Sequence, residues 1–245
     1  MFEFYNSTIR HNFALSGIVS EIFSSQLTSM LSDSKVEENV GMSKQQIMQN
    51  ILPQSYIFET FREYLNNNLY LLNSNEAFTC FKVVRGQISM INSEFVNQQY
   101  VIYAINSKVS LSHSRIENMS IDSRLFRISE SDTNIESMTL TNLSCSSRSY
   151  ELFYFIKAYV EVQTLNYSNS TCQLMTSSLS QINLKALNSQ LITLANTSLV
   201  ILHHSLSSDL NQDRKEIPTC LTTSSFSNIS ITNGYLILIK DSGVS

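Results

Sequence analysis

Four cationic and aromatic side chains recur along the chain at similar intervals. They are Lys82, Tyr103, Arg127 and Tyr154, separated by 21, 24 and 27 residues (103 − 82, 127 − 103 and 154 − 127), and Thr193 continues the series. Aromatic rings bind sugar rings and cations, and an Arg guanidinium stacks on a Tyr ring. If one face of the molecule collects these side chains, they predict either a ligand-binding strip that docks a glycan or a protein, or a self-supporting cation–aromatic stack.

Carboxylates are poorly placed for catalysis in this sequence. Enzymes that cleave polysaccharides use a close pair of Asp or Glu side chains. Glu130 and Asp132 share one polar segment with Asp122 nearby, but no Asp-Asp pair occurs and carboxylates in turns are usually only solvated. We therefore predict no catalytic residue.

Metal-ligand spacings are also missing from the sequence. The four Cys form no Cys-x-x-Cys pair, and His203 and His204 are adjacent, so they point to opposite faces of a strand. The sequence therefore predicts neither a metal site nor a cofactor.

An internal repeat explains the intervals between these side chains. Five times, a mostly apolar pair of residues is followed, 17 positions after its first member, by a small polar residue. The repeats are Cys80 with Asn97, Val101 with Asn118, Leu125 with Asn142, Leu152 with Asn169, and Leu191 with Ser208 (97 − 80, 118 − 101, 142 − 125, 169 − 152 and 208 − 191). This regularity indicates a solenoid, in which each repeat buries its apolar face against its neighbours.

Each repeat contains three short segments of alternating apolar residues. In the first repeat these segments contribute Phe81 and Val83, then Ile88 and Met90, then Phe95. Period-two alternation is typical of a strand, and three short strands fill such a repeat without room for a helix.

The predicted fold is all-β, a right-handed parallel β-helix solenoid of about six to seven coils, because parallel crossovers are right-handed in nearly all proteins. A leucine-rich repeat is the rival solenoid. It is less favoured because each Asn follows the last apolar residue by two positions, where that repeat expects three.

The repeat is less regular outside its central blocks. Leu174 and Leu184 predict a degenerate coil with Asn188 near its corner, and residues 208–218 predict a polar insertion. We assign residues 68–245 to the β-helix and expect its last coil, begun at Leu236, to be incomplete.

Residues 1–67 predict a different kind of segment. Ser43 to Gln46 has a capping-box pattern, Pro53 ends that helix and Ser55 begins a second one. We expect an irregular or helical cap that covers the exposed end of the solenoid, with its helical part over residues 43–67. A divergent coil in residues 1–30 and a polar connector over 31–42 complete this prediction.

Three strings in the repeats resemble a known family. Residues 93–97 (SEFVN), 114–120 (SRIENMS) and 225–230 (SFSNIS) resemble the Ser-x-Phe-x-Asn-x-Ser repeats of pectin-lyase-like right-handed β-helix proteins. They are similar above all to large repeat-rich surface proteins of unicellular eukaryotes and to bacterial polymorphic membrane proteins. The resemblance covers residues 80–240, but those relatives usually follow the Asn with a Gly-Gly turn, and this chain has only 5 Gly.

The recurring Asn residues predict a structural ladder, in which stacked side-chain amides hydrogen-bond from coil to coil. Asn tolerates the left-handed conformation that such corners require. The predicted ladder residues are Asn97, Asn118, Asn142, Asn169 and Asn228.

Seven Asn-x-Ser/Thr sequons occur, and four of them overlap this ladder. We expect an Asn inside a ladder corner to carry no glycan. That leaves Asn6, Asn166 and Asn196 as predicted glycosylation sites if the chain is secreted.

Two cysteines occupy the same offset on successive repeats. Cys145 and Cys172 each follow a ladder Asn by three residues (145 − 142 and 172 − 169). Stacked coils lie about 4.8 Å apart, which is within the Cα separation of a disulfide. The pair predicts either a disulfide or two stacked buried thiols, whereas Cys80 and Cys220 are not expected to pair.

Composition limits the partners of the chain. Hydrophobic residues make up 42% and charged residues 15%, with a net charge of −4 and a pI of about 5.6, so we expect no nucleic-acid partner. The sequence has no run of 18 apolar residues and no signal-peptide pattern at its first residues. We expect an extracellular or cell-surface location as part of a longer protein.

The function that fits these features best is a non-catalytic structural or adhesin-like surface module. It would be a fragment of a larger extracellular repeat protein and would bind a glycan or a protein partner. The alternative is a degenerate carbohydrate-active enzyme, a polysaccharide lyase or hydrolase of the pectin-lyase-like superfamily.

Overall fold

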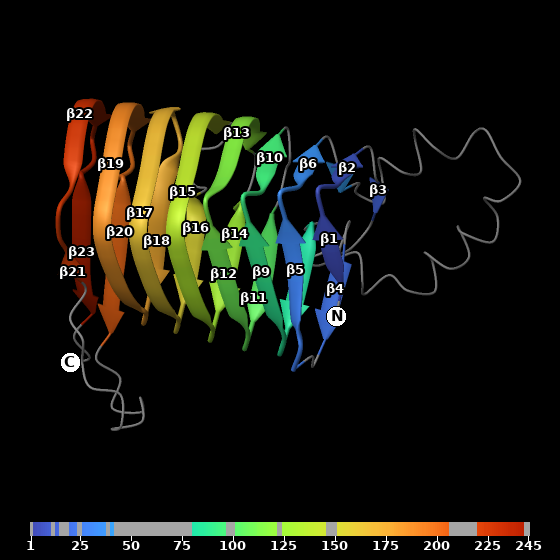
Figure 1. The fold of residues 1–245 in the computed structure, drawn as a ribbon. Coiled ribbons are helices and arrows are strands. Elements are labelled where there is room, and N and C mark those ends of the chain that lie inside the picture. The colour runs from blue at the N-terminus through green and yellow to red at the C-terminus, as the bar shows by residue number, and fades with distance from the viewer. Residues whose placement is uncertain are drawn as a thin grey trace, which may run out of the picture.

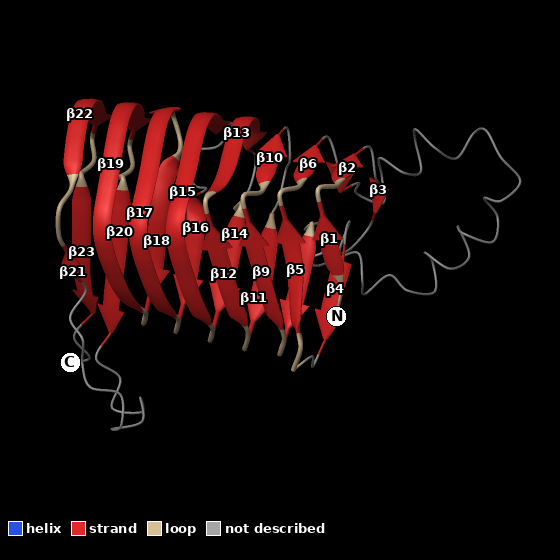
Figure 2. Ribbon diagram, viewed as in Figure 1, coloured by secondary structure: helices blue, strands red, loops and turns tan. Residues whose placement is uncertain are grey.

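The computed structural model of the chain describes residues 2–10, 13–14, 20–23, 26–37, 40–41, 80–96, 101–121, 124–145, 151–205 and 220–242. In these residues the regular elements are all β-strands, which stack into an elongated parallel β-solenoid (Figures 1 and 2). The all-β β-helix prediction is therefore confirmed. The predicted helices of residues 43–67 and the insertion of residues 208–218 lie outside the described residues.

One face of the solenoid is an eight-stranded parallel sheet. Its strands, in stacking order, are β4 (Ser20–Phe23), β8 (Phe81–Val84), β11 (Ile102–Ile105), β14 (Phe126–Ser129), β16 (Glu151–Ile156), β18 (Gln173–Ser178), β20 (Val200–Ser205) and β23 (Ile237–Ser242). Eight strands stack in this sheet, whereas the sequence predicted about six to seven coils.

A thirteen-stranded sheet forms the other two faces. Its first row contains β1 (Glu3–Tyr5), β5 (Thr28–Ser32), β9 (Gln87–Ile91), β12 (Lys108–Ser112), β15 (Asp132–Cys145), β17 (Tyr159–Ser170), β19 (Gln181–Ala195) and β21 (Cys220–Leu221). Its second row contains β2 (Thr8–Arg10), β6 (Lys35–Glu37), β10 (Glu94–Val96), β13 (Ser114–Ile121), the later halves of β15, β17 and β19, and β22 (Ser225–Thr232). The short strands β3 (Phe13–Ala14) and β7 (Val40–Gly41) pair with each other.

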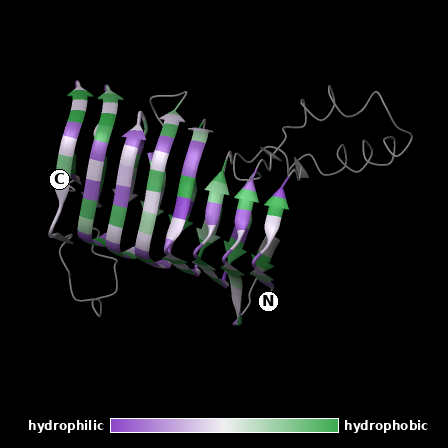
Figure 3. Ribbon diagram, turned by 45° about the horizontal axis from the view of Figure 1, so that its top comes forward, coloured by the Kyte–Doolittle hydropathy of each residue, from purple (hydrophilic) through white to green (hydrophobic). Residues whose placement is uncertain are grey.

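The core is built from side chains that alternate along each strand, so that every second residue points inward. The strand ribbons in Figure 3 carry bands of more hydrophobic and more hydrophilic residues. In the eight-stranded sheet, one in-register series of side chains is at most 1% exposed: Phe81, Ile102, Phe126, Phe153 and Met175. The Phe126 and Phe153 rings stack with centroids 4.6 Å apart at an interplanar angle of 12°. Stacking identical offsets therefore turns the sequence repeat into continuous apolar columns.

The prediction that a repeat begins at Leu191 is wrong. Ser170 pairs with Ile192, which places Leu191 level with Asn169 at a corner rather than at the start of a coil. The coil starts at Leu199 instead, because Val200 pairs with Met175 in the eight-stranded sheet. The Leu191-Ile192 pair resembles a coil start, but β19 runs through the corner without interruption.

The N-terminal residues contain more strand than the sequence predicted. Strands β1, β2 and β4 lie within residues 1–30 and pair with later coils, as the divergent-coil alternative proposed. The expectation of a polar connector over 31–42 is wrong, because β5 and β6 pair with β9 and β10. The buried side chains of Leu31 and Val36 complete two apolar columns, which explains why these segments join the solenoid.

Candidate functional site

The outer face of the eight-stranded sheet carries the predicted cation–aromatic column. Lys82, Tyr103, Arg127 and Tyr154 occupy one in-register position on adjacent strands β8, β11, β14 and β16. The next position along this column is Thr176 on β18. The inclusion of Thr193 was wrong, because it followed from the misplaced repeat at Leu191.

Guanidinium groups cover the aromatic rings of this column. The Arg127 guanidinium lies 5.6 Å from the Tyr103 ring centroid, and the Tyr103 side chain is only 6% exposed. The Arg124 guanidinium lies 4.0 Å from the Tyr154 ring centroid. Both rings therefore contact cations of the same chain. Lys82, Arg127 and Tyr154 are half-buried, so they are the more accessible side chains of the column.

Arg124 and Glu151 support this column and were missed in the sequence. Arg124 Nε donates to Glu151 Oε1 at 2.6 Å, and the Glu151 side chain is only 6% exposed. A buried carboxylate needs such a partner, and the pairing also fixes the guanidinium over Tyr154. The missed signal is that both residues directly precede the apolar start of a coil, at Leu125 and Leu152.

A second candidate surface is a shallow groove of about 420 Å³ on the outer side of β9, β12, β15 and β17. One register across it holds Ser89, Ser110, Asn134 and Glu161, and a parallel register holds Gln87, Lys108, Asp132 and Tyr159. Lys185 Nζ donates to Glu161 Oε1 at 2.6 Å at its edge. Hydroxyl, amide and a few charged groups at this spacing suit a polar, extended ligand such as a glycan.

Metal ligands do not gather on either surface. Among the described residues, no group of three or more His, Cys, Asp or Glu side chains could hold a metal ion. Asp132 and Glu161 lie on neighbouring strands but at different register positions, since Asp132 pairs with Tyr159 and Asn134 with Glu161.

The Asn ladder runs along one outer corner of the solenoid. Asn142 Nδ2 donates to Asn118 Oδ1 at 2.9 Å, and Asn169 Nδ2 donates to Asn142 Oδ1 at 2.5 Å. All three residues have positive φ, between 47° and 55°, as their left-handed corner requires. Their side chains are exposed, so the ladder lies on the outer surface of the corner. The expectation that it lies inside the corner is wrong.

Leu191 interrupts this ladder. It occupies the next rung after Asn169 with a φ of 53° and a 51% exposed side chain, and Asn228 follows it on the next rung with the same φ. A Leu side chain can neither donate nor accept a hydrogen bond. The ladder therefore joins Asn118, Asn142 and Asn169, and Asn228 stands beyond the gap, while Asn97 lies outside the described residues.

Buried serines form further ladders that sequence analysis missed. Ser107 N donates to Ser131 Oγ at 3.0 Å, and Ala158 N donates to Ser180 Oγ at 3.1 Å. At a second corner, Ser7 N donates to Ser34 Oγ at 3.1 Å. The available signal was a Ser directly after many of the positive-φ corner residues, for example Ser107 after Asn106.

The three predicted glycosylation sites lie in different environments. Asn6 is exposed at a corner with a φ of 46°. Asn166 is half-buried on β17 and its Oδ1 accepts from Asn188 Nδ2 at 3.0 Å. Asn196 is exposed with a φ of 56°, and its Oδ1 accepts from Asn233 Nδ2 at 2.9 Å. Their glycosylation stays a prediction.

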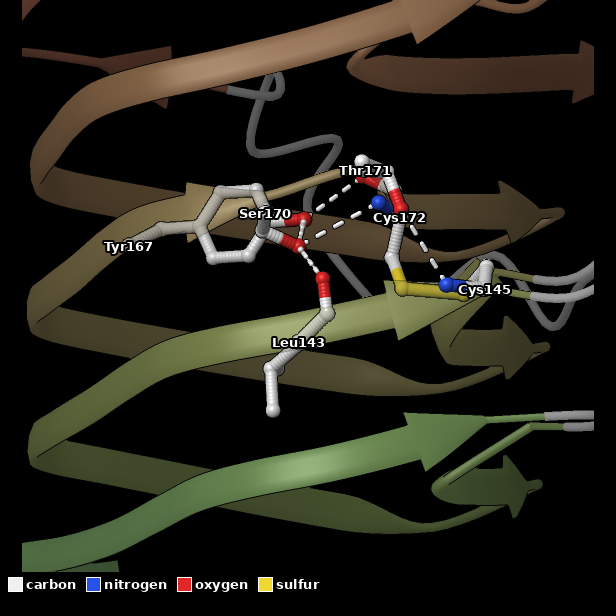
Figure 4. The surroundings of a disulfide bond; sticks show 6 residues. All are labelled: Leu143, Cys145, Tyr167, Ser170, Thr171 and Cys172. Carbon is white, nitrogen blue, oxygen red and sulfur yellow. Dashed lines mark hydrogen bonds between the residues drawn. A yellow bond between two sulfur atoms is a disulfide. The ribbon is translucent and has the colours of Figure 1, made fainter.

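Cys145 and Cys172 form a disulfide between neighbouring coils (Figure 4). Their Cα atoms lie 5.1 Å apart, as expected for stacked strands. Cys172 is fully buried, and Cys145 N donates to Thr171 Oγ1 at 3.2 Å. Of the two alternatives that the spacing left open, the structure contains the bridge.

A buried tyrosine packs against this bridge. The Tyr167 hydroxyl donates to the Cys172 carbonyl oxygen at 2.6 Å and lies 2.5 Å from Ser170 Oγ (Figure 4). Ser170 Oγ donates to the Leu143 carbonyl oxygen at 2.9 Å in the preceding coil. Burial raises the pKa of Tyr167, so the hydroxyl stays protonated and remains a donor.

Cys80 is a buried core cysteine outside the disulfide. Burial raises the pKa of Cys80 to about 12, which keeps it in the unreactive thiol form at neutral pH. It is therefore a packing residue.

Comparison of the chain with protein-family models, with curated proteins and with solved structures gave no match. The part of the chain that the structure describes contains no helix long and apolar enough to cross a membrane. The site geometry must therefore carry the functional argument.

Removing the disulfide tests its contribution to stability. It closes a loop of 27 residues, for which chain entropy gives about 3 kcal/mol. A thiol reductant should lower the free energy of unfolding of the oxidised protein by about this amount in urea denaturation. The Cys145→Ala/Cys172→Ala double variant is the control and should not respond; an equal response of both proteins would contradict the bridge.

Completing the ladder tests the account of the corner. Leu191→Asn should stabilise the fold, because Asn tolerates positive φ better than Leu and adds amide hydrogen bonds to Asn169 and Asn228. The matched control is Leu179→Asn, which also removes a positive-φ Leu (φ 53°) but lies outside this ladder.

We expect Leu191→Asn to exceed this control by about 1 kcal/mol in chemical denaturation. The proteins must come from a host that adds no N-linked glycans, because the substitution creates an Asn-Ile-Thr sequon. Equal effects of the two variants would show that the Asn ladder adds nothing to stability.

Proposed function

We propose that the protein is a non-catalytic structural or adhesin-like module that works outside the cell or on its surface. The observation that carries this proposal is the Cys145–Cys172 disulfide between coils. Disulfides persist in oxidising compartments and are rare in the cytosol. A structural bridge beside the fully buried Tyr167 therefore favours a secreted location.

Stacking supports a structural role for this module. Consecutive coils are held by parallel backbone hydrogen bonds, by serine and asparagine ladders and by the covalent bridge. In a solenoid each coil contacts only its neighbours, so these links act in series along the axis and give a stiff rod. Such a rod suits a spacer that presents its sides to partners.

The two candidate surfaces support an adhesin-like role. The groove offers hydroxyl and amide groups with Lys108 and Glu161. The cation–aromatic column that begins at Lys82, here called the Lys82 column, offers cations over aromatic rings. Both suit a glycan or a polar protein surface. Binding along a rigid sheet costs little ordering entropy, so modest contacts suffice.

A degenerate carbohydrate-active enzyme is the competing function, and Asp132 and Glu161 in the groove are the groups that would serve it. Incubation of the full chain with polyanionic glycans separates the two. The proposed module releases no unsaturated or reducing-end sugars. Product formation that Glu161→Gln abolishes would replace it with the enzyme.

Binding provides the positive test. The secreted chain should bind glycan arrays or cell surfaces, and Tyr154→Ala should weaken that binding about threefold to fivefold, the value of one exposed cation–aromatic contact. Gln163→Ala, at an exposed position of β17, is the control and should leave binding unchanged. If both variants bind like the parent, the Lys82 column is not the ligand surface.

A further inference from the structure

The sequons of this chain differ in whether the Asn side-chain nitrogen, Nδ2, donates a hydrogen bond in the ladder. An N-linked glycan is attached to Asn Nδ2. In Asn142 and Asn169 this nitrogen donates to the Asn of the preceding coil, at 2.9 and 2.5 Å. An N-linked glycan replaces one of the two protons on this nitrogen, so a sugar on either Asn would crowd the neighbouring ladder side chains, whose coils stack about 4.8 Å apart.

Asn228 shares the corner but not the constraint. Gln190 pairs with Ser227 and Ile192 with Ile229, so the rung before Asn228 is Leu191, which has no acceptor for its amide. No described residue forms a hydrogen bond with the Asn228 side chain, which is exposed, and Ser230, the third residue of the sequon, is exposed as well. The interruption that weakens the ladder thus leaves this amide available.

We propose that Asn228 is an N-glycosylation site of the folded solenoid. This inference rests on the proposed extracellular function, because the modification occurs in the secretory pathway. The co-reactant is an oligosaccharide linked to a polyprenyl pyrophosphate. A bond forms between Asn228 Nδ2 and the anomeric carbon, the bond to the pyrophosphate oxygen breaks, Nδ2 loses one proton and the lipid pyrophosphate leaves.

The test uses the full chain, secreted from a eukaryotic host behind a cleavable leader. Glycosidase treatment in labelled water and peptide mass spectrometry identify each modified Asn in the folded, disulfide-bonded product. We expect Asn228 to be occupied and Asn142 and Asn169 to be unoccupied. Ser230→Ala, which keeps the corner Asn but destroys the sequon, should lose one glycan.

Controls separate this inference from the proposed function. Ser144→Ala destroys the sequon of Asn142 and should leave the glycan number unchanged. A folded, disulfide-bonded product with Asn228 bare, or with Asn142 occupied, would overturn the inference and leave the extracellular proposal standing.

Discussion

The parallel, in-register pairing of coil on coil is the constraint on which the rest of this structure depends. Each strand donates and accepts its backbone hydrogen bonds across a spacing of about 4.8 Å, so the same offset of every coil falls above its counterpart. Inward offsets must then be apolar, as in the Phe126–Phe153 stack, and corner offsets must tolerate positive φ. The spacing of apolar and corner residues in the sequence repeat follows from this geometry.

The corners show how polar groups meet the same constraint. Inside the corners, Ser hydroxyls such as that of Ser131 accept from the backbone N–H of a neighbouring coil and satisfy donors that burial would leave unpaired. Outside them, Asn side chains bond to each other in series. Leu191 satisfies the shape of the corner but not its hydrogen bonding, and this single residue separates Asn228 from the ladder.

Sequence alone predicted the fold class, because period-two alternation within a repeat of 21 to 27 residues admits three strands and little else. It placed the Lys82 column correctly up to Tyr154, since these coils keep one spacing between their first strand and their Asn corner. It failed at Leu191, where an apolar pair on a continuous strand resembles a coil start and only pairing with Ser170 and Met175 reveals the register. The serine ladders and the Arg124–Glu151 pair were missed because their local signals, a Ser after a corner residue and a charged residue before a coil start, do not specify which groups meet between coils.

The functional proposal follows from the same stacking, since coils joined by hydrogen bonds and a disulfide, with polar outer faces, suit a structural scaffold. The most direct measurement of the stacking register is a pair of engineered cysteines across β15 and β17. Thr139→Cys with Asn166→Cys occupies paired positions on the outer face and should cross-link in high yield under mild oxidation, as mapped by peptide mass spectrometry. Thr139→Cys with Gln163→Cys, three residues out of register, should not; equal yields from both pairs would contradict the in-register solenoid.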